Sequence, residues 1–331
     1  MLKKSTKYFC YAIYLLAVAI IFDVVILRYL LGIGYPTHLE QENILRYPTP
    51  YVEFNGKPGT NGHNSFGFLG PSLHKASECD LKIAFFAGST GYNGNPPIPV
   101  LLEKKLKEKL GSNVFLGNYS MLSANHRQHL HAMIEYIQGL ETDIVIFYGG
   151  FNETLQSAYF DPRPGYPYNF FYRGETSPFI KVLMENSALF GELDQRTGIF
   201  TGLNKLQEQY QPFSREWNTN ITDHYFETLK SARELSGILP SSYFDAPVFI
   251  AFYQPYQIPK EFKQAHKSIT QRLDTVDYIH DVSSLYDKFG QKVYTDMVHV
   301  LQYAREAMAA RMADEIAKKM LLNTPDKHKC R

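Results

Sequence analysis

Two apolar patterns alternate along the chain between residues 81 and 150. Short, continuously apolar runs are typical of strands with both faces covered, and the segments between them have apolar residues at helical spacing. The expected strands are "LKIAFFA" (81–87), "NVFLGNYS" (113–120) and "TDIVIFYGG" (142–150), and the expected helices are "IPVLLEKKLKEKL" (98–110) and "HRQHLHAMIEYIQGL" (126–140). Because strands that alternate with helices favour a parallel sheet, we predict an α/β fold, a three-layer α/β/α sandwich with a mostly parallel sheet.

The regular alternation breaks after the third strand. The segment from about 153 to 220 is longer than an ordinary loop and contains the aromatic- and proline-rich run "YFDPRPGYPYNFFYRG". Beyond it we expect a helix at 222–236, strands at 246–255 and 276–283, and a closing helix at 301–320. The pattern therefore predicts one α/β domain with an insertion at about 153–220.

The amino-terminal segment has the length and composition of a membrane-spanning helix. Three lysines precede residues 8–27, which carry a single charge at Asp23, and about 20 apolar residues suffice to cross a bilayer. The preceding lysines favour a cytoplasmic amino terminus, which places everything after about residue 35 on the other side. The alternative is a signal peptide cleaved after residues 17–19, but the apolar run continues past that site. We interpret the segment as an uncleaved anchor.

These patterns divide the chain into four parts. Residues 1–35 are the cytoplasmic tip and transmembrane anchor, and residues 36–80, rich in Pro, Gly and Asn, are a connector. Residues 81–322 are the α/β domain with its insertion, and residues 323–331 are a tail. The catalytic chemistry is expected in the third part, outside the cytoplasm.

Composition excludes some classes of function. A chain of 331 residues that is 44% hydrophobic and 15% aromatic can fill a large core, which argues against disorder. A net charge of +1 without a long basic run argues against a nucleic-acid partner. The glycines at 88, 91 and 94 lack both the lysine of a phosphate-binding loop and the helix that follows a dinucleotide fingerprint. No cofactor is therefore expected.

Two groups of residues leave alternatives open. Cys10 lies in the anchor, and Cys79 and Cys330 could pair in an oxidising compartment, although unpaired thiols are slightly favoured. The histidines at 126, 129 and 131 have no accompanying carboxylate. We interpret them as a solvated helix start and expect no metal site.

The stretch Gly88-Ser89-Thr90 follows the first strand and could present a nucleophile. A serine hydroxyl needs a histidine to take its proton and a carboxylate to orient that histidine. Asp296 and His299 lie three residues apart just before the last helix, so they share one face of a helical turn. Asp277 and His280 have the same spacing, but within a strand that spacing directs them to opposite faces. We therefore favour Ser89, His299 and Asp296.

An ester-cleaving serine also needs donors for the oxyanion. Asn152 follows the glycine pair at the end of the third strand, and alone it would be interpreted as a turn residue. Because sites of open α/β sheets form at the carboxyl ends of strands, we expect Asn152 to lie near Ser89.

These short blocks together resemble the SGNH/GDSL hydrolases, in particular membrane-anchored or periplasmic members associated with surface polysaccharides. Gly88-Ser89-Thr90 is similar to the nucleophile block, with Thr90 where the family has Asp. The sequence "GGFNE" (149–153) is similar to the G-x-N block, and "TDMVH" (295–299) is similar to the D-x-x-H block. The sequence "NSFGFLG" (64–70) is similar to the segment before the nucleophile strand. The resemblance covers residues 61–320. It implies a flavodoxin-like SGNH fold, a catalytic Ser89-His299-Asp296 triad and an oxyanion amide at Asn152.

One block departs from the family pattern. Ser123 stands where a glycine usually supplies a backbone N–H to the oxyanion hole, and a serine adopts positive φ less readily than glycine. The backbone donor does not depend on the side chain, so Ser123 stays a candidate. Tyr166 and Tyr168 of the insertion are candidate sugar-stacking residues, with an internal core of the insertion as the alternative.

The resemblance implies a serine esterase that removes an O-acyl group, commonly acetyl, from a cell-surface carbohydrate through an acyl-enzyme. A sugar hydroxyl in place of water would give an O-acyltransferase instead. The third alternative, motivated by Ser123, is a non-catalytic polysaccharide-assembly protein on the same fold.

Overall fold

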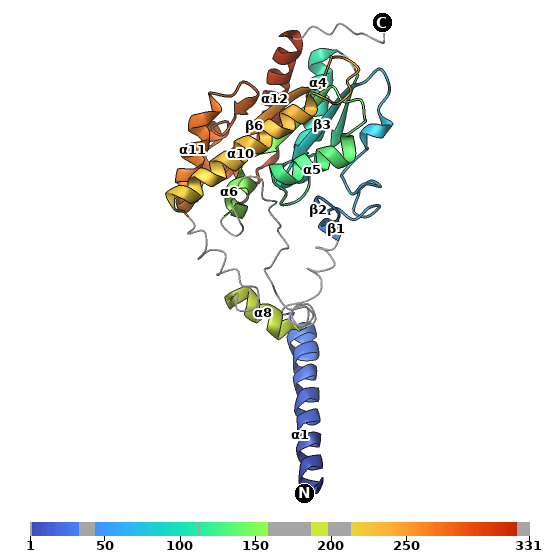
Figure 1. Ribbon diagram of the computed structural model, residues 1–331, viewed down its shortest axis with the longest axis vertical. Helices are drawn as coiled ribbons and strands as arrows, with labels where there is room; N and C mark the ends of the chain where they lie inside the picture. Colours follow the sequence, from blue (N-terminus) through green and yellow to red (C-terminus); the bar gives the residue numbers. More distant parts are fainter. Residues whose placement is uncertain (1, 33–43, 112, 158–186, 198–212, 323–331) are drawn as a thin grey trace. The chain divides into compact units, whose positions relative to one another are not determined.

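The computed structural model describes residues 2–32, 44–111, 113–157, 187–197 and 213–322 (Figure 1). The chain divides into two compact units. One comprises Met1–Asn43 and Phe171–Gln209, and the other comprises Ile44–Phe170 and Tyr210–Arg331. Tyr166 and Tyr168 of the insertion, and Cys330 of the tail, lie outside the described residues.

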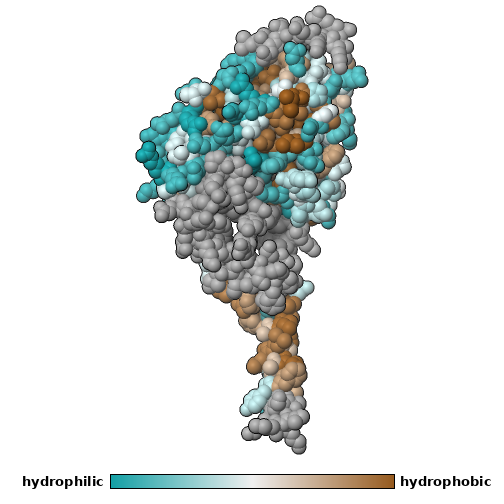
Figure 2. All heavy atoms as spheres, viewed as in Figure 1, coloured by the Kyte–Doolittle hydropathy of each residue, from teal (hydrophilic) through white to brown (hydrophobic). Residues whose placement is uncertain are grey.

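The first unit contains the amino-terminal helix. Helix α1 (Leu2–Ile21) continues into the π-helix η1 (Phe22–Leu30), and helix α8 (Ala188–Thr197) of the insertion contacts η1. Within the helix, the 21 residues Lys7–Leu27 are long and apolar enough to cross a membrane, a property that a signal sequence shares. Figure 2 shows that the surface of this helix is hydrophobic along most of its length, whereas the visible face of the second unit is mostly hydrophilic.

The second unit is built on a five-stranded parallel sheet. Its order is β4 (Val114–Asn118), β3 (Leu81–Ala87), β5 (Ile144–Gly149), β6 (Val248–Tyr253) and β7 (Ile279–Asp281), with every pair parallel. All five strands lie where the apolar runs predicted them. Every residue of β3 is buried, because neighbours pair with both of its edges and helices cover both of its faces.

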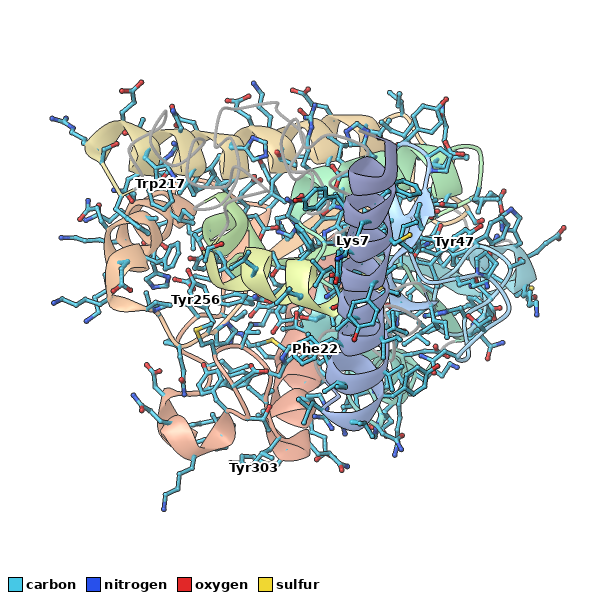
Figure 3. All side chains as sticks on the ribbon, turned by 90° about the horizontal axis from the view of Figure 1, so that it is seen from below. Lys7, Phe22, Tyr47, Trp217, Tyr256 and Tyr303 are labelled. Atoms are coloured by element: carbon cyan, nitrogen blue, oxygen red, sulfur yellow. The ribbon has the colours of Figure 1, made fainter. Side chains whose placement is uncertain are left out.

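Helices cover both faces of the sheet and complete the predicted three layers. Alternate residues of β3 pack on opposite sides: Ile83 and Phe85 contact one apolar cluster, and Ala84 and Phe86 contact the other. Helices α4 (Ile98–Leu110) and α12 (Gln302–Leu322) supply the first cluster, and α5 (His126–Ile137), α10 (Arg215–Ser236) and α11 (Lys263–Leu273) supply the second. In Figure 3, Trp217 on α10 and Tyr303 on α12 lie on opposite sides of the sheet.

Shorter elements connect these layers. They are the antiparallel pair β1 (Tyr47–Thr49) and β2 (Glu53–Asn55), the helices α3 (Ser89–Tyr92) and α6 (Phe151–Ser157), and the 3-10 turns η2 (Leu73–Lys75), η3 (Lys260–Phe262), η4 (Asp287–Phe289) and η5 (Gln291–Val293). The connector is therefore partly structured, since β1 and β2 pair within it.

The state of one cysteine differs from the expectation. Cys79 is disulfide-bonded, whereas Cys10 is a free cysteine. The preference for an unpaired thiol at Cys79 is therefore wrong. The pairing of Cys79 with Cys330 stays a prediction.

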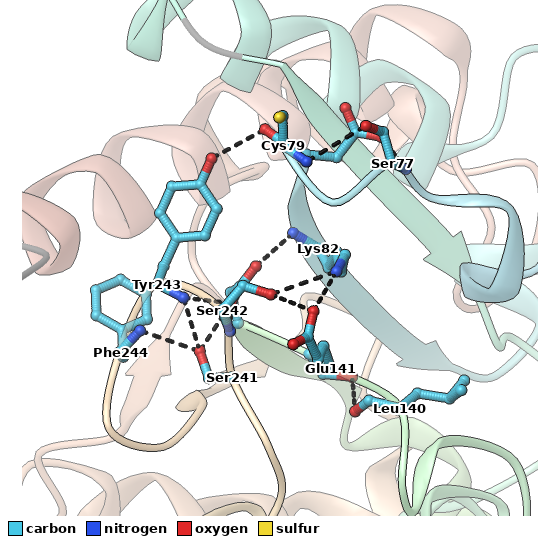
Figure 4. Close-up of polar contacts among 12 residues, drawn as sticks. Ser77, Cys79, Lys82, Leu140, Glu141, Ser241, Ser242, Tyr243 and Phe244 are labelled. Atoms are coloured by element: carbon cyan, nitrogen blue, oxygen red, sulfur yellow. Dashed lines mark hydrogen bonds and ion pairs between the residues drawn. The ribbon is translucent and has the colours of Figure 1, made fainter. Parts of the chain in front are cut away.

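A buried polar network closes the amino-terminal edge of the sheet. Lys82 Nζ donates to Glu141 Oε2 at 2.7 Å and to Ser242 Oγ at 3.3 Å (Figure 4). Asp143 is fully buried and accepts hydrogen bonds from the backbone N–H groups of Lys82 and Ser242, both at 2.8 Å. Tyr243 N, at 3.0 Å, and Ser241 Oγ, at 2.7 Å, also donate to Asp143. Asp143 therefore fixes the loop before β6 against β3.

Replacing Asp143 with alanine is expected to destabilise the fold by about 3 kcal/mol or more, because several buried donors lose their acceptor. Asp277→Ala is the matched control, since the Asp277 side chain is 74% exposed and pairs with Arg233 at 3.5 Å. An exposed pair contributes about 1 kcal/mol or less. Urea unfolding of both variants measures the difference, and equal midpoints would contradict the role given to Asp143.

Candidate active site

Ser89 begins the short helix α3 directly after β3. The chain turns at Gly88, whose carbonyl accepts hydrogen bonds from Gly91 N at 3.1 Å and Tyr92 N at 3.3 Å. A Cβ at Gly88 would lie 2.5 Å from Asn152 Nδ2, so glycine is needed for this close approach. The half-buried Ser89 therefore lies at the carboxyl end of β3, in a turn packed against Asn152.

Asp296 and His299 form a close pair in the loop before α12. His299 Nδ1 lies 2.6 Å from Asp296 Oδ2, and Asp296 Oδ1 accepts from His299 N and Val298 N, both at 2.8 Å. Partial burial alone would raise the pKa of Asp296, but these hydrogen bonds outweigh burial and hold that pKa below its ordinary value. A carboxylate at Nδ1 favours the tautomer with its proton on that nitrogen, in which Nε2 is the acceptor.

The acceptor nitrogen of His299 faces Asn93. His299 Nε2 lies 3.2 Å from Asn93 Nδ2, and among the hydrogen bonds of the described residues none joins it to Ser89 Oγ. Asn93 itself follows α3, and its backbone N–H donates to Ser89 O at 2.7 Å. Hydrogen bonds of a catalytic site are often long or absent before substrate binds. In this resting arrangement the Asn93 amide occupies the position that a serine hydroxyl needs.

The candidate residues line two adjoining cavities. Ser89 and Asn152 line a small one, while Asp296 and His299 line a larger one of about 420 Å³. Thr90 and Val298 line both cavities, so the two open side by side at the carboxyl edge of the sheet. Another cavity of about 490 Å³, lined by residues before β6 and β7, contains none of the candidate residues.

Asn152 presents an amide beside Ser89. It lies in the first turn of α6, after Gly150, which has φ +134°. Asn152 Nδ2 donates to Ala124 O at 2.7 Å. A side-chain amide carries two N–H donors, so the bond to Ala124 orients the amide and leaves the second donor for a ligand.

Ser123 adopts the conformation that the sequence analysis expected to be costly. Its φ is +59°, a region that favours glycine. Its Oγ accepts a hydrogen bond from Arg46 Nη2 at 2.8 Å. Arg46 lies before β1, so a segment that precedes the first strand of the parallel sheet helps to hold the loop between β4 and α5.

Replacing Ser123 with glycine tests whether its backbone or its hydroxyl matters. If the backbone N–H is the donor, Ser123→Gly retains ester hydrolysis within about threefold of wild type, because the donor remains and the positive φ becomes easier. Steady-state kinetics measure this. A loss of 100-fold or so, of the size expected for a missing oxyanion donor, would instead assign the role to the hydroxyl.

A buried carboxylate beneath the site was missed by the sequence analysis. Glu153 Oε1 accepts from His126 N and Oε2 accepts from Gly150 N, both at 2.7 Å. Burial raises the pKa of Glu153. The available signal was the acidic residue directly after Asn152. Glu153 links the start of α5 to the turn that carries Asn152.

The expectation of solvated histidines is wrong for His126 and His129. Both are fully buried, their Nδ1 atoms lie 3.3 Å apart, and burial lowers the pKa of each to about 3. Glu153 supplies the polar partner that permits burial, since its Oε1 also lies 3.5 Å from His126 Nδ1. Among the residues that the structure describes, no group of three or more His, Cys, Asp or Glu could hold a metal ion.

Two further residues complete the picture of the site. Gln254, directly after β6, is buried and accepts from Thr90 Oγ1 at 3.0 Å, which ties the turn that carries Ser89 to a third strand. His280, the alternative histidine, lies against Glu315 of α12 at 3.6 Å. The structure thus brings Ser89, Asn152, Asp296 and His299 to one edge of the sheet.

Comparisons with known proteins find similarity to this chain only among solved structures. No family model and no curated protein sequence matches the chain. Similar structures include a lipase from a goat rumen metagenome (16% identity over 70% of this chain and 97% of the other, TM-score 0.41). They also include a GDSL-like lipase from Bacteroides thetaiotaomicron (10% identity, 75% and 94%, TM-score 0.41) and an acetylxylan esterase from Geobacillus stearothermophilus (13% identity, 72% and 95%, TM-score 0.40).

These structural neighbours are a lipase, a GDSL-like lipase and an acetylxylan esterase, and the second has the name of the family that the sequence motifs resemble. The α/β/α fold rests on the parallel sheet and the two helical layers themselves.

Proposed function

We propose that the protein is a serine esterase of the SGNH/GDSL type that acts on an O-acyl ester of a carbohydrate. The observation that carries this proposal is the Asp296–His299 pair, which lies at the sheet edge beside Ser89 and Asn152. The polar side chains of Thr90, Asn93, Thr295 and Gln302 line the cavity of about 420 Å³ beside His299. Such a lining suits the hydroxyl groups of a sugar.

In the proposed mechanism, substrate displaces the Asn93 amide from His299. Ser89 Oγ then attacks the ester carbonyl as His299 Nε2 takes its proton, and Asp296 stabilises the imidazolium. The second N–H of Asn152 and the backbone N–H groups of Ser89 and Ser123 hold the oxyanion. His299 returns the proton to the leaving alcohol, and water, activated by His299, releases the acid from the acyl-enzyme.

We further propose that the chain is a single-pass membrane protein with a cytoplasmic amino terminus and an extracytoplasmic α/β domain. The apolar span Lys7–Leu27 supports anchoring, and the lysines before it support this orientation. The disulfide-bonded state of Cys79 supports an oxidising compartment.

Two alternatives share the same fold, and the first of them also uses the same site. Transfer of the acyl group to a sugar hydroxyl would make the protein an O-acyltransferase. The Asn93 contact at His299 Nε2 favours the other alternative, a non-catalytic polysaccharide-assembly protein.

An assay of p-nitrophenyl acetate hydrolysis by the purified full-length protein distinguishes the catalytic functions from the non-catalytic one. An esterase or acyltransferase gives a burst or turnover above a Ser89→Ala control, and absence of both would overturn the catalytic proposal. With an acetylated oligosaccharide as donor and an unacetylated one as acceptor, free acetate supports the esterase. An acetylated acceptor supports the transferase.

A further inference from the structure

The first unit pairs a helix of the insertion with the membrane span. The backbone N–H of Leu189, in the first turn of α8, donates to Asp23 Oδ1 at 2.8 Å. Asp23 is the single charge between residues 8 and 27, and a carboxylate near the bilayer is costly unless it has a partner. Amide groups at a helix start, where the dipole is positive, favour such a charge. Helix α8 therefore satisfies the one charge of the span.

Two leucines of α8 are exposed. Ala188 is fully buried, whereas Leu189 is 54% exposed and Leu193 is 41% exposed. Residues four apart lie on the same helix face, so the two leucines form one surface beside the membrane span. Water would be an unfavourable environment for this leucine pair.

The depth of Asp23 in the proposed membrane span indicates that lipid covers the leucine pair. Asp23 lies four residues before Leu27, the end of the apolar span. This corresponds to at most roughly 6 Å, the value at the rise of an α-helix, since both residues lie in the π-helix η1. Helices that lie in a membrane interface bury their apolar faces by about 5–10 Å. The first turn of α8 is thus held at the depth of an interfacial helix.

We propose that α8 lies in the extracytoplasmic membrane interface, with Leu189 and Leu193 in contact with lipid acyl chains and Asp23 as its attachment point. This inference rests on the proposed membrane anchor. It gives part of the insertion a lipid partner, so that the chain contacts the bilayer at two elements far apart in sequence.

Site-directed fluorescence tests this contact on the full-length protein in lipid nanodiscs. With Cys10 changed to serine, a Leu193→Cys variant is labelled with an environment-sensitive dye. We expect a lipid with a nitroxide near the top of its acyl chain to quench the dye, and aqueous iodide to quench it weakly. Strong iodide quenching without lipid quenching would overturn the proposal. Weak quenching by both the lipid nitroxide and iodide would also overturn it, because the leucine pair would then be covered by protein, as in a contact with a second copy of the chain.

Two controls separate failure of the anchor from failure of the α8 contact. A dye at Leu16→Cys must be quenched by a nitroxide deep in the acyl chains, and absence of that quenching would overturn the anchor itself. Adding Asp23→Ala to Leu193→Cys is expected to reduce lipid quenching and increase iodide quenching, while Asp23→Asn, which keeps an acceptor oxygen, restores part of the lipid quenching. Identical quenching in all three backgrounds would contradict the role of Asp23.

Discussion

The Ser89→Ala variant is expected to lose ester hydrolysis by about 10⁴-fold or more in kcat/KM, because the proposed acyl-enzyme cannot form without the hydroxyl. The half-buried Ser89 accepts a backbone hydrogen bond through its carbonyl, which alanine retains, so the fold is expected to remain. Hydrolysis of p-nitrophenyl acetate and circular dichroism measure the two quantities.

Histidine variants identify the base that acts on Ser89. His299→Gln is expected to lower kcat/KM by a similar factor of about 10⁴, since the general base is lost. His280→Gln is the matched control, because His280 lies against Glu315 on α12, and we expect activity near that of wild type. If His280→Gln were inactive and His299→Gln active, the proposed triad would be wrong.

The larger part of the fold follows from the apolar pattern because a central parallel strand must be apolar on both faces. The run from Leu81 to Ala87 is fully buried, and no polar residue interrupts the sequence "IAFFA" within it. The approach of Ser89 and Asn152 was likewise predictable, because parallel strands bring their carboxyl ends to one edge.

Features that depend on a partner far along the chain were not predictable from local pattern. The burial of His126 depends on Glu153, and the positive φ of Ser123 is accompanied by a hydrogen bond from Arg46. Helical spacing alone indicated a solvated start for α5, since it takes no account of a carboxylate 27 residues away. The contact between Asn93 and His299 depends on side-chain rotamers, which spacing does not determine.

Glu153 is expected to be a positioning residue for the oxyanion amide. Its carboxylate holds His126 N and Gly150 N, and so joins the two segments that carry Ala124 and Asn152. Those segments also meet directly through the bond from Asn152 Nδ2 to Ala124 O. Without the carboxylate, two buried N–H groups lose their acceptor and the turn before Asn152 is free to shift.

The Glu153→Ala variant is therefore expected to lower kcat by about 10²–10³-fold, the size of a lost oxyanion donor, with a smaller change in KM. It is also expected to lose about 2–6 kcal/mol of stability, because each unpaired buried donor costs about 1–3 kcal/mol. Glu153→Gln keeps one acceptor oxygen, so its kcat is expected to lie between those of alanine and wild type.

Kinetics and urea unfolding of the same preparations distinguish positioning from a purely structural role. Glu108→Ala is the control for loss of a carboxylate, since Glu108 is exposed on α4 and pairs with Lys105 at 3.1 Å; both its kcat and its stability are expected to match wild type. Asn152→Ala is the reference for the amide itself, and combining it with Glu153→Ala is expected to lower kcat little further, because residues that act as a unit are not additive. If Glu153→Ala reduces stability while the folded enzyme keeps the wild-type kcat, then Glu153 supports the fold and does not position Asn152.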